Sequence, residues 1–204
     1  MMGMRKMRWA LQELEAPTEE PVTLADAKLH LRVDGDEENT WIERAIRAAR
    51  EFCEETQQRA YVARRFRMSL ERWPCGRVIV LPKPPLQSVE AITYILADGT
   101  VETLDPSQYV VDAASEPGTI YLAPGASWPA GQLAPGMPIR VEFTAGYGAA
   151  AAVPERVKQA ILLLVGHWYE NRETVLVGSI SRSLEFAVEA LLWQDRFWYS
   201  GPEG

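Results

Sequence analysis

Between Glu37 and Gln58, apolar side chains recur at intervals of three and four residues, as they do along one face of an α-helix. The stripe consists of Trp41, Ile42, Ala45, Ile46, Ala49, Phe52 and Cys53. The opposite face is charged, so the segment predicts an amphipathic helix with one side in a core. A shorter helix over 24–31 is expected before it, because Thr23 and Asp26 have the spacing of an N-terminal capping box.

Near Tyr61 the hydrophobic period changes to the alternation that is typical of a half-buried strand. The alternating apolar residues are Phe66, Met68 and Leu70. Further short strands are expected over 77–81, 89–96, 100–104, 109–112, 119–122 and 139–144. Asp98-Gly99 is a hairpin signal between two of them, because glycine accepts the positive φ of a tight turn. Residues 61–148 therefore predict an antiparallel β module.

A third helix is expected over 155–172. Pro154 stands where this helix can begin, because a proline in the first turn loses no needed hydrogen bond. Residues 160–165 are apolar nearly all round the helix, so more than one of its sides must be covered. The helix over 37–58 can cover one side, and the β module or another subunit must cover the rest. The residues expected to face a neighbouring subunit are Leu162, Val165, Tyr169 and Arg172.

The C-terminal end of the chain is rich in aromatic residues. A mixed segment over 174–183 is followed by an amphipathic helical piece from Leu184 to about Phe197. Aromatic and arginine side chains are enriched in interface hot spots, so the end of the chain either contacts another subunit or partner or docks on its own core. We take the first as the working hypothesis. The residues predicted to form this subunit or partner interface are Leu191, Leu192, Trp193, Arg196, Phe197, Trp198 and Tyr199.

Together these patterns predict an α+β fold. Its helical core has two N-terminal helices and one long C-terminal helix, and an antiparallel β module is inserted between them. The expected division is an N-terminal arm over 1–22, a helical core over 23–60 and 149–173, the β module over 61–148, and a C-terminal interaction arm over 174–204.

Length and composition narrow the class of protein. A chain of 204 residues with 47% hydrophobic residues can bury a single sizeable core. The net charge of −7 argues against a protein that grips nucleic acid, because neutralising phosphates needs a surplus of Lys and Arg. Cys53 and Cys75 do not form a disulfide framework, which fits a reducing compartment. We expect no signal peptide and no membrane span, since the longest apolar run, 160–166, is too short.

The chain offers little that could carry chemistry. His30 and His167 lie on separate predicted helices without a second ligand type at metal spacing, so no metal site is expected. Gly146-Tyr147-Gly148 follows a strand, but it lacks the further glycine and the basic residue of a phosphate-binding loop. We therefore predict no catalytic residues and no cofactor. A small cytoplasmic enzyme with a carboxylate in a cleft stays an alternative that no constellation of residues supports.

Four segments carry a further signal through their order and spacing. They are Pro21–Arg32; Asp34–Glu38 with the helix from Trp41-Ile42 to Phe52-Cys53; Phe143–Gly148 with Val153-Pro154 and the helix to Glu173; and Glu189–Leu192 with Arg196. In this arrangement the chain resembles the head–tail connector, or head-completion adaptor, family of long-tailed bacteriophages and gene transfer particles. Two departures are visible: Trp193-Gln194-Asp195 replaces the usual spacer, and the β insertion is longer than in the smaller members.

The resemblance implies a non-enzymatic structural subunit that forms a ring, typically of twelve copies, below the portal of a virion. The implied partners are other copies of the chain, the portal protein, a neck stopper or tail protein, and DNA, which passes through the channel without specific binding. The implied location is the head–tail junction, after synthesis in the cytoplasm of the bacterial host. A related alternative is a stopper or tail-completion neck protein, but such proteins are usually β-dominated and the flanking helices disfavour it.

Overall fold

The computed structural model describes residues 7–172 and 182–203. The chain divides into two compact units, and it passes between them four times. The β unit takes its described residues from 1–16, 63–146 and 198–204. The helical unit takes its described residues from 17–62 and 147–197. Helices and antiparallel sheets are both present, which confirms the predicted α+β class.

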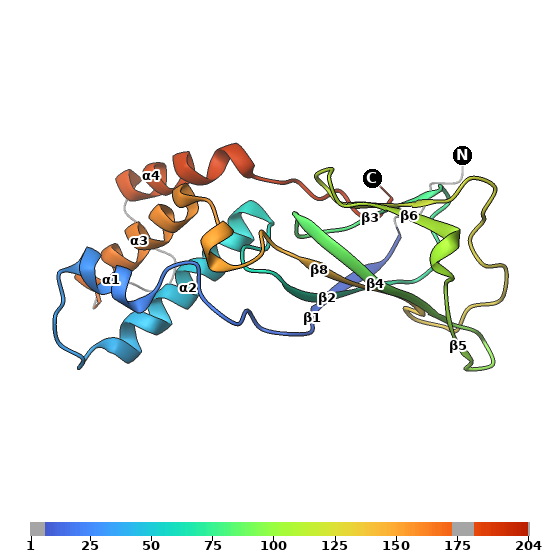
Figure 1. Ribbon diagram of the computed structural model, residues 1–204, viewed down its shortest axis with the longest axis horizontal. Coiled ribbons are helices and arrows are strands. Elements are labelled where there is room, and N and C mark those ends of the chain that lie inside the picture. The colour runs from blue at the N-terminus through green and yellow to red at the C-terminus, as the bar shows by residue number, and fades with distance from the viewer. Residues whose placement is uncertain (1–6, 173–181, 204) are drawn as a thin grey trace. The chain divides into compact units, whose positions relative to one another are not determined.

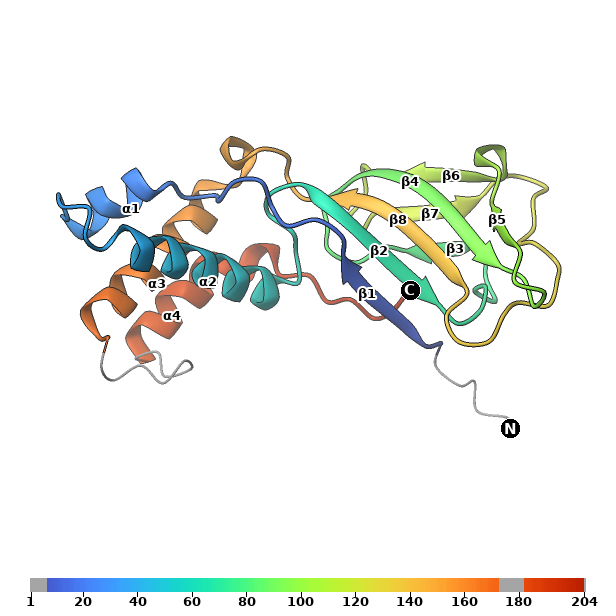
Figure 2. The same cartoon turned by 90° about the horizontal axis from the view of Figure 1, so that it is seen from below.

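The helical unit contains α1 (Leu24–Leu31), α2 (Asn39–Gln57), α3 (Glu155–Glu170) and α4 (Arg182–Leu192), with short 3-10 turns η2 (Ala150–Ala152) and η3 (Trp193–Asp195) (Figures 1 and 2). The capping box predicted at Thr23 is present, because the Thr23 hydroxyl accepts a hydrogen bond from the Asp26 backbone N–H at 3.1 Å. α3 packs against each of the three other helices, and Ala160, Ile161 and Leu164 are fully buried in the shared core.

A buried polar network ties α2 to segments that are distant in the sequence. Glu54 accepts hydrogen bonds from Arg50 Nη1 and from the Tyr61 backbone N–H, both at 2.8 Å. Arg50 Nε also donates to Glu20 Oε2 at 2.7 Å. One turn along α2, the Gln57 amide accepts from the Tyr61 hydroxyl at 2.7 Å. Burial raises the pKa of the Tyr61 phenol, so the hydroxyl keeps its proton and remains the donor.

The β unit has two antiparallel sheets. The five-stranded sheet has the order β1-β2-β8-β4-β5, and the three-stranded sheet, which lies over one of its faces, has the order β3-β7-β6 (Figures 1 and 2). The strands are β1 (Trp9–Glu13), β2 (Arg64–Leu70), β3 (Val78–Val80), β4 (Leu86–Ile95), β5 (Val101–Thr103), β6 (Tyr109–Asp112), β7 (Thr119–Leu122) and β8 (Ile139–Ala145). The alternation predicted for β2 is observed, and its buried Phe66 stacks on Phe143 of β8 at 5.7 Å.

The structure differs from the expected N-terminal arm. Residues 9–13 form β1, which pairs with β2 in the register Trp9↔Leu70. Residues 17–22 join the helical unit instead, where the Val22 side chain is buried in the core. β1 was not predicted because it is a short edge strand whose partner lies more than fifty residues away. No local sequence pattern indicates such a pairing.

We predict that Glu54→Ala destabilises the fold by about 3–5 kcal/mol, because it leaves the Arg50 guanidinium buried without its main anionic partner. Glu51→Ala is the matched control on the same helix. Its carboxylate is exposed, so its effect should stay within about 0.5 kcal/mol. Urea denaturation of both variants measures the difference, and equal losses of stability would show that the network contributes little.

Candidate assembly surfaces

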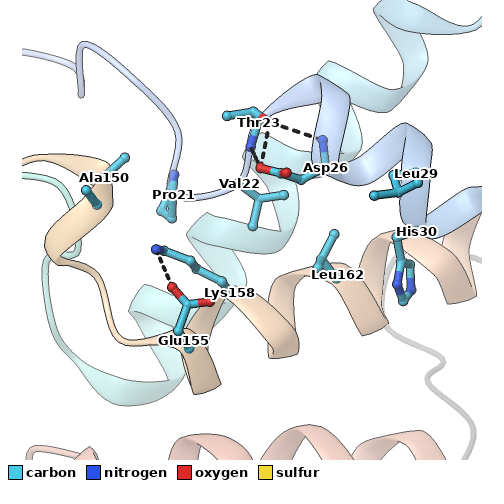
Figure 3. Close-up of a pocket in the computed structure, with 11 residues that line it drawn as sticks. Pro21, Val22, Thr23, Asp26, Leu29, His30, Ala150, Glu155, Lys158 and Leu162 are labelled. Atoms are coloured by element: carbon cyan, nitrogen blue, oxygen red, sulfur yellow. Dashed lines mark hydrogen bonds and ion pairs between the residues drawn. The ribbon is translucent and has the colours of Figure 1, made fainter.

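An open groove lies between α1 and α3 in the helical unit (Figure 3). Its volume is about 650 Å³. The apolar part of its lining comes from Pro21, Val22, Leu29, Ala150, Ala151 and Leu162. Leu29 of α1 is 80% exposed, whereas Ala27 of the same helix is fully buried. The groove is therefore a surface on which apolar atoms remain in contact with water.

The groove follows from the way α1 and α3 meet. α1 has eight residues and α3 has sixteen, so α1 can cover only part of α3. The two helices approach closely near His30 and Gly166, because a Cβ atom at Gly166 would lie 3.3 Å from His30 Nε2. Toward the N-terminus of α3 they leave room, and Figure 3 shows Leu162 pointing from α3 toward α1.

The polar groups of the groove do not converge on a reaction centre. The Asp26 carboxylate accepts from the Thr23 hydroxyl at 2.6 Å, so it serves the helix cap. Lys158 Nζ donates to Glu155 Oε1 at 2.7 Å on the other wall. The charged groups Asp26, Lys158 and Glu155 are therefore used in a helix cap and in an ion pair on α3.

α4 presents two different faces. Val188 and Leu192 are buried in the helical core at 3% and 1% exposure. Phe186 is 70% exposed, and Trp193, which begins η3, is 65% exposed. Leu191 is partly buried and packs against the same core. The helix is therefore held to its unit by one face while large aromatic side chains remain in solvent on the other.

Part of the predicted C-terminal interface docks on the chain itself. The Leu192 side chain is buried, and its carbonyl accepts from Gln57 Nε2 at 2.6 Å. The Phe197 backbone N–H donates to the Gln57 carbonyl at 2.9 Å. The Tyr199 hydroxyl donates to the Val80 carbonyl at 2.8 Å, and burial raises the pKa of its phenol. Leu192 is therefore corrected from an interface residue to a core residue, while Tyr199 is partly buried and has an internal partner for its hydroxyl.

The remaining predicted interface residues are more accessible. Trp198 is 65% exposed, and Phe197 and Arg196 are partly buried. The N-terminal part of the predicted C-terminal arm, residues 174–181, lies outside the described residues. From Arg182 onward the expected arm is not a detached segment, because α4 belongs to the helical unit and residues 198–203 belong to the β unit.

The four residues predicted on the inter-subunit side of α3 have different environments. Val165 is fully buried between the helices of its own unit, so it is corrected to a core residue. Leu162 is partly buried at the groove. Tyr169 and Arg172 belong to a cluster with Trp41 and Glu38 at the other end of α3.

In that cluster the Arg172 guanidinium carbon lies 4.7 Å from the Trp41 ring centroid and 4.4 Å from the Tyr169 ring centroid. Its Nη2 donates to Glu38 Oε2 at 2.6 Å. This hydrogen bond lowers the pKa of the Glu38 carboxyl below its ordinary value. The cluster links the start of α2 to the end of α3, and the sequence did not reveal it because Glu38 and Arg172 are 134 residues apart.

Within residues 7–172 and 182–203, no three His, Cys, Asp or Glu side chains are grouped so that they could hold a metal ion. No helix of the same ranges is long and apolar enough to cross a membrane.

Comparison with known proteins gives a consistent set of similarities. The family model described as "Head completion protein" matches residues 21–182. A chain from the neck of an empty GTA particle, computed with C6 symmetry, is 27% identical and has a TM-score of 0.74. A chain from the virion of a native gene transfer agent (GTA) particle is 26% identical with the same TM-score. Each comparison covers 95% of this chain and 99% of the other. No curated protein matches the sequence.

The Arg172 cluster generates a prediction with a pH dependence. Arg172→Ala should lower the melting temperature, and Arg172→Lys should restore only part of it, because an ammonium group cannot stack its plane on two rings. The pKa of Glu38 is depressed in the fold, so its contribution is present above the ordinary pKa of 4.5 and is lost as the pH falls below it.

The difference in melting temperature between the wild type and Arg172→Ala should therefore shrink in acid. Thermal unfolding followed by circular dichroism from neutral pH to below 4.5 measures this trend. A difference that is the same at every pH would assign the effect to ring stacking alone.

Proposed function

Because the chain belongs to the head completion protein family, we propose that it is the adaptor that joins the head of a phage-like particle to its tail. The family match spans residues 21–182, which is most of the chain and includes parts of both units. Membership identifies a structural virion protein, not an enzyme.

The observation that carries the proposal is the extent of the likeness to neck proteins. The matched neck chain of the empty GTA particle is covered over 99% of its length, so the similarity includes the β unit as well as the helices. A fold shared only in a helical bundle would say little about function, because bundles serve many purposes. Likeness over nearly the whole length of a neck subunit favours a place for this chain in the neck of its own particle.

We further propose that the chain acts as a ring, with twelve copies as the expected number. A related neck was computed with C12 symmetry and another with C6 symmetry, and both are compatible with twelve identical subunits. Such a ring would lie below the portal. It would contact the portal protein on one side and a neck stopper or tail protein on the other.

The distribution of charge supports a passage for DNA without specific binding. The helical unit carries 17 acidic and 11 basic side chains, a net charge of −6, whereas the β unit carries 11 acidic and 10 basic, a net charge of −1. A ring of such subunits repels phosphates on average, so DNA would not adhere to it during packaging or ejection.

We expect that particles produced without this chain are DNA-filled heads that lack tails, because the docking surface for the tail is missing. Electron microscopy of the particles counts tailed and tailless heads. Purified wild-type chain added to the tailless heads should restore attachment of tails. Tailed particles that form at the normal frequency without the chain would refute the adaptor function.

A further inference from the structure

The exposed face of α4 is a short apolar ridge. Phe186, Ala190 and Trp193 follow one another at intervals of four and three residues, so they share one side of the helix, and all three are exposed. Glu189 is exposed between them on the same side. The spacing i, i+4, i+7 is the pattern with which one helix anchors in the groove of a partner. We call Phe186, Glu189, Ala190 and Trp193 the α4 ridge.

The groove between α1 and α3 lies on the opposite side of the same unit. α3 packs against both α1 and α4, and Figures 1 and 2 show it between them. The α4 ridge of one molecule therefore cannot reach the groove of that molecule. Two unlike surfaces on opposite sides of a subunit are what a head-to-tail contact requires, and such contacts close into rings when the rotation allows it.

The chemistry of the two surfaces is complementary. The α4 ridge carries two large aromatic side chains, and the groove offers the exposed Leu29 together with Leu162 as apolar contacts. The ridge has the carboxylate of Glu189 at its centre, and the groove has the ammonium group of Lys158 in its wall. Lys158 is 18% exposed and its present partner, Glu155, is 87% exposed, so the lysine can exchange that partner at little cost.

We propose that the α4 ridge of one copy occupies the α1–α3 groove of the next copy. This contact rests on the proposed ring and specifies which surfaces build it. A second copy is favoured over an unrelated partner because both halves of the contact are present on one chain. Each subunit of a closed ring makes the contact twice, so a modest pairwise affinity is sufficient.

Cross-linking in assembled particles tests the contact directly. The chain is produced with Ala190→Cys in the ridge and Leu29→Cys in the groove, in a Cys75→Ser background that removes an exposed thiol. Cys53 is fully buried and stays unreactive. A short bismaleimide should join neighbouring copies into a ladder of covalent multimers on a denaturing gel. The two chains that carry only one of the introduced cysteines are the controls and should stay monomeric.

A second variant tests how much the aromatic side chains of the α4 ridge contribute to the contact between copies. Phe186→Asp/Trp193→Asp should lower incorporation into particles by about tenfold or more, because aromatic anchors dominate such contacts. Val101→Asp is the matched control, an exposed apolar residue of the β unit at 60% exposure. Retained far-UV circular dichroism and cooperative melting establish that both variants fold.

The outcomes separate the contact from the proposed function. Tailed particles that contain the double-cysteine chain but give no multimers would overturn the ridge-in-groove contact and leave the adaptor function standing. Normal incorporation of the ridge variant would overturn it as well. A wild-type chain that never enters particles would instead refute the adaptor function itself.

Discussion

The structure depends on covering α3. This helix is apolar on nearly all of its sides between Ala160 and Val165, and water must be kept from each of them. α2 covers one side, α4 covers another through Val188 and Leu192, and α1 covers part of a third. Because α1 is only eight residues long, the cover stops near Leu162, and the groove is what remains.

The need to cover α3 also explains why the chain from α4 onward packs on its own units. α4 is needed inside the helical unit, so its buried face is fixed by the core and not by a partner. Residues 198–203 continue into the β unit, where the backbone N–H of Val80 donates to the Pro202 carbonyl at 3.0 Å. From α4 onward, the large aromatic side chains that remain more than half exposed are Phe186, Trp193 and Trp198.

Local patterns in the sequence predicted the elements well. α1 and its capping box at Thr23 were expected at the observed residues, because capping depends on side chains three positions apart. The strand at Phe66 followed from its alternation. β1 and the Arg172 cluster could not be predicted, because each joins residues far apart in the chain. Val165 and Leu192 were wrongly assigned to an interface, because composition shows how much apolar surface must be covered but not which surface covers it.

If this chain is part of the neck, it lies at one position in each finished particle. Gold-conjugated antibodies against the chain, applied to purified tailed particles, show that position. We expect gold where the head meets the tail, in particles opened enough to admit antibody. Gold on the head shell or at the distal end of the tail would contradict it.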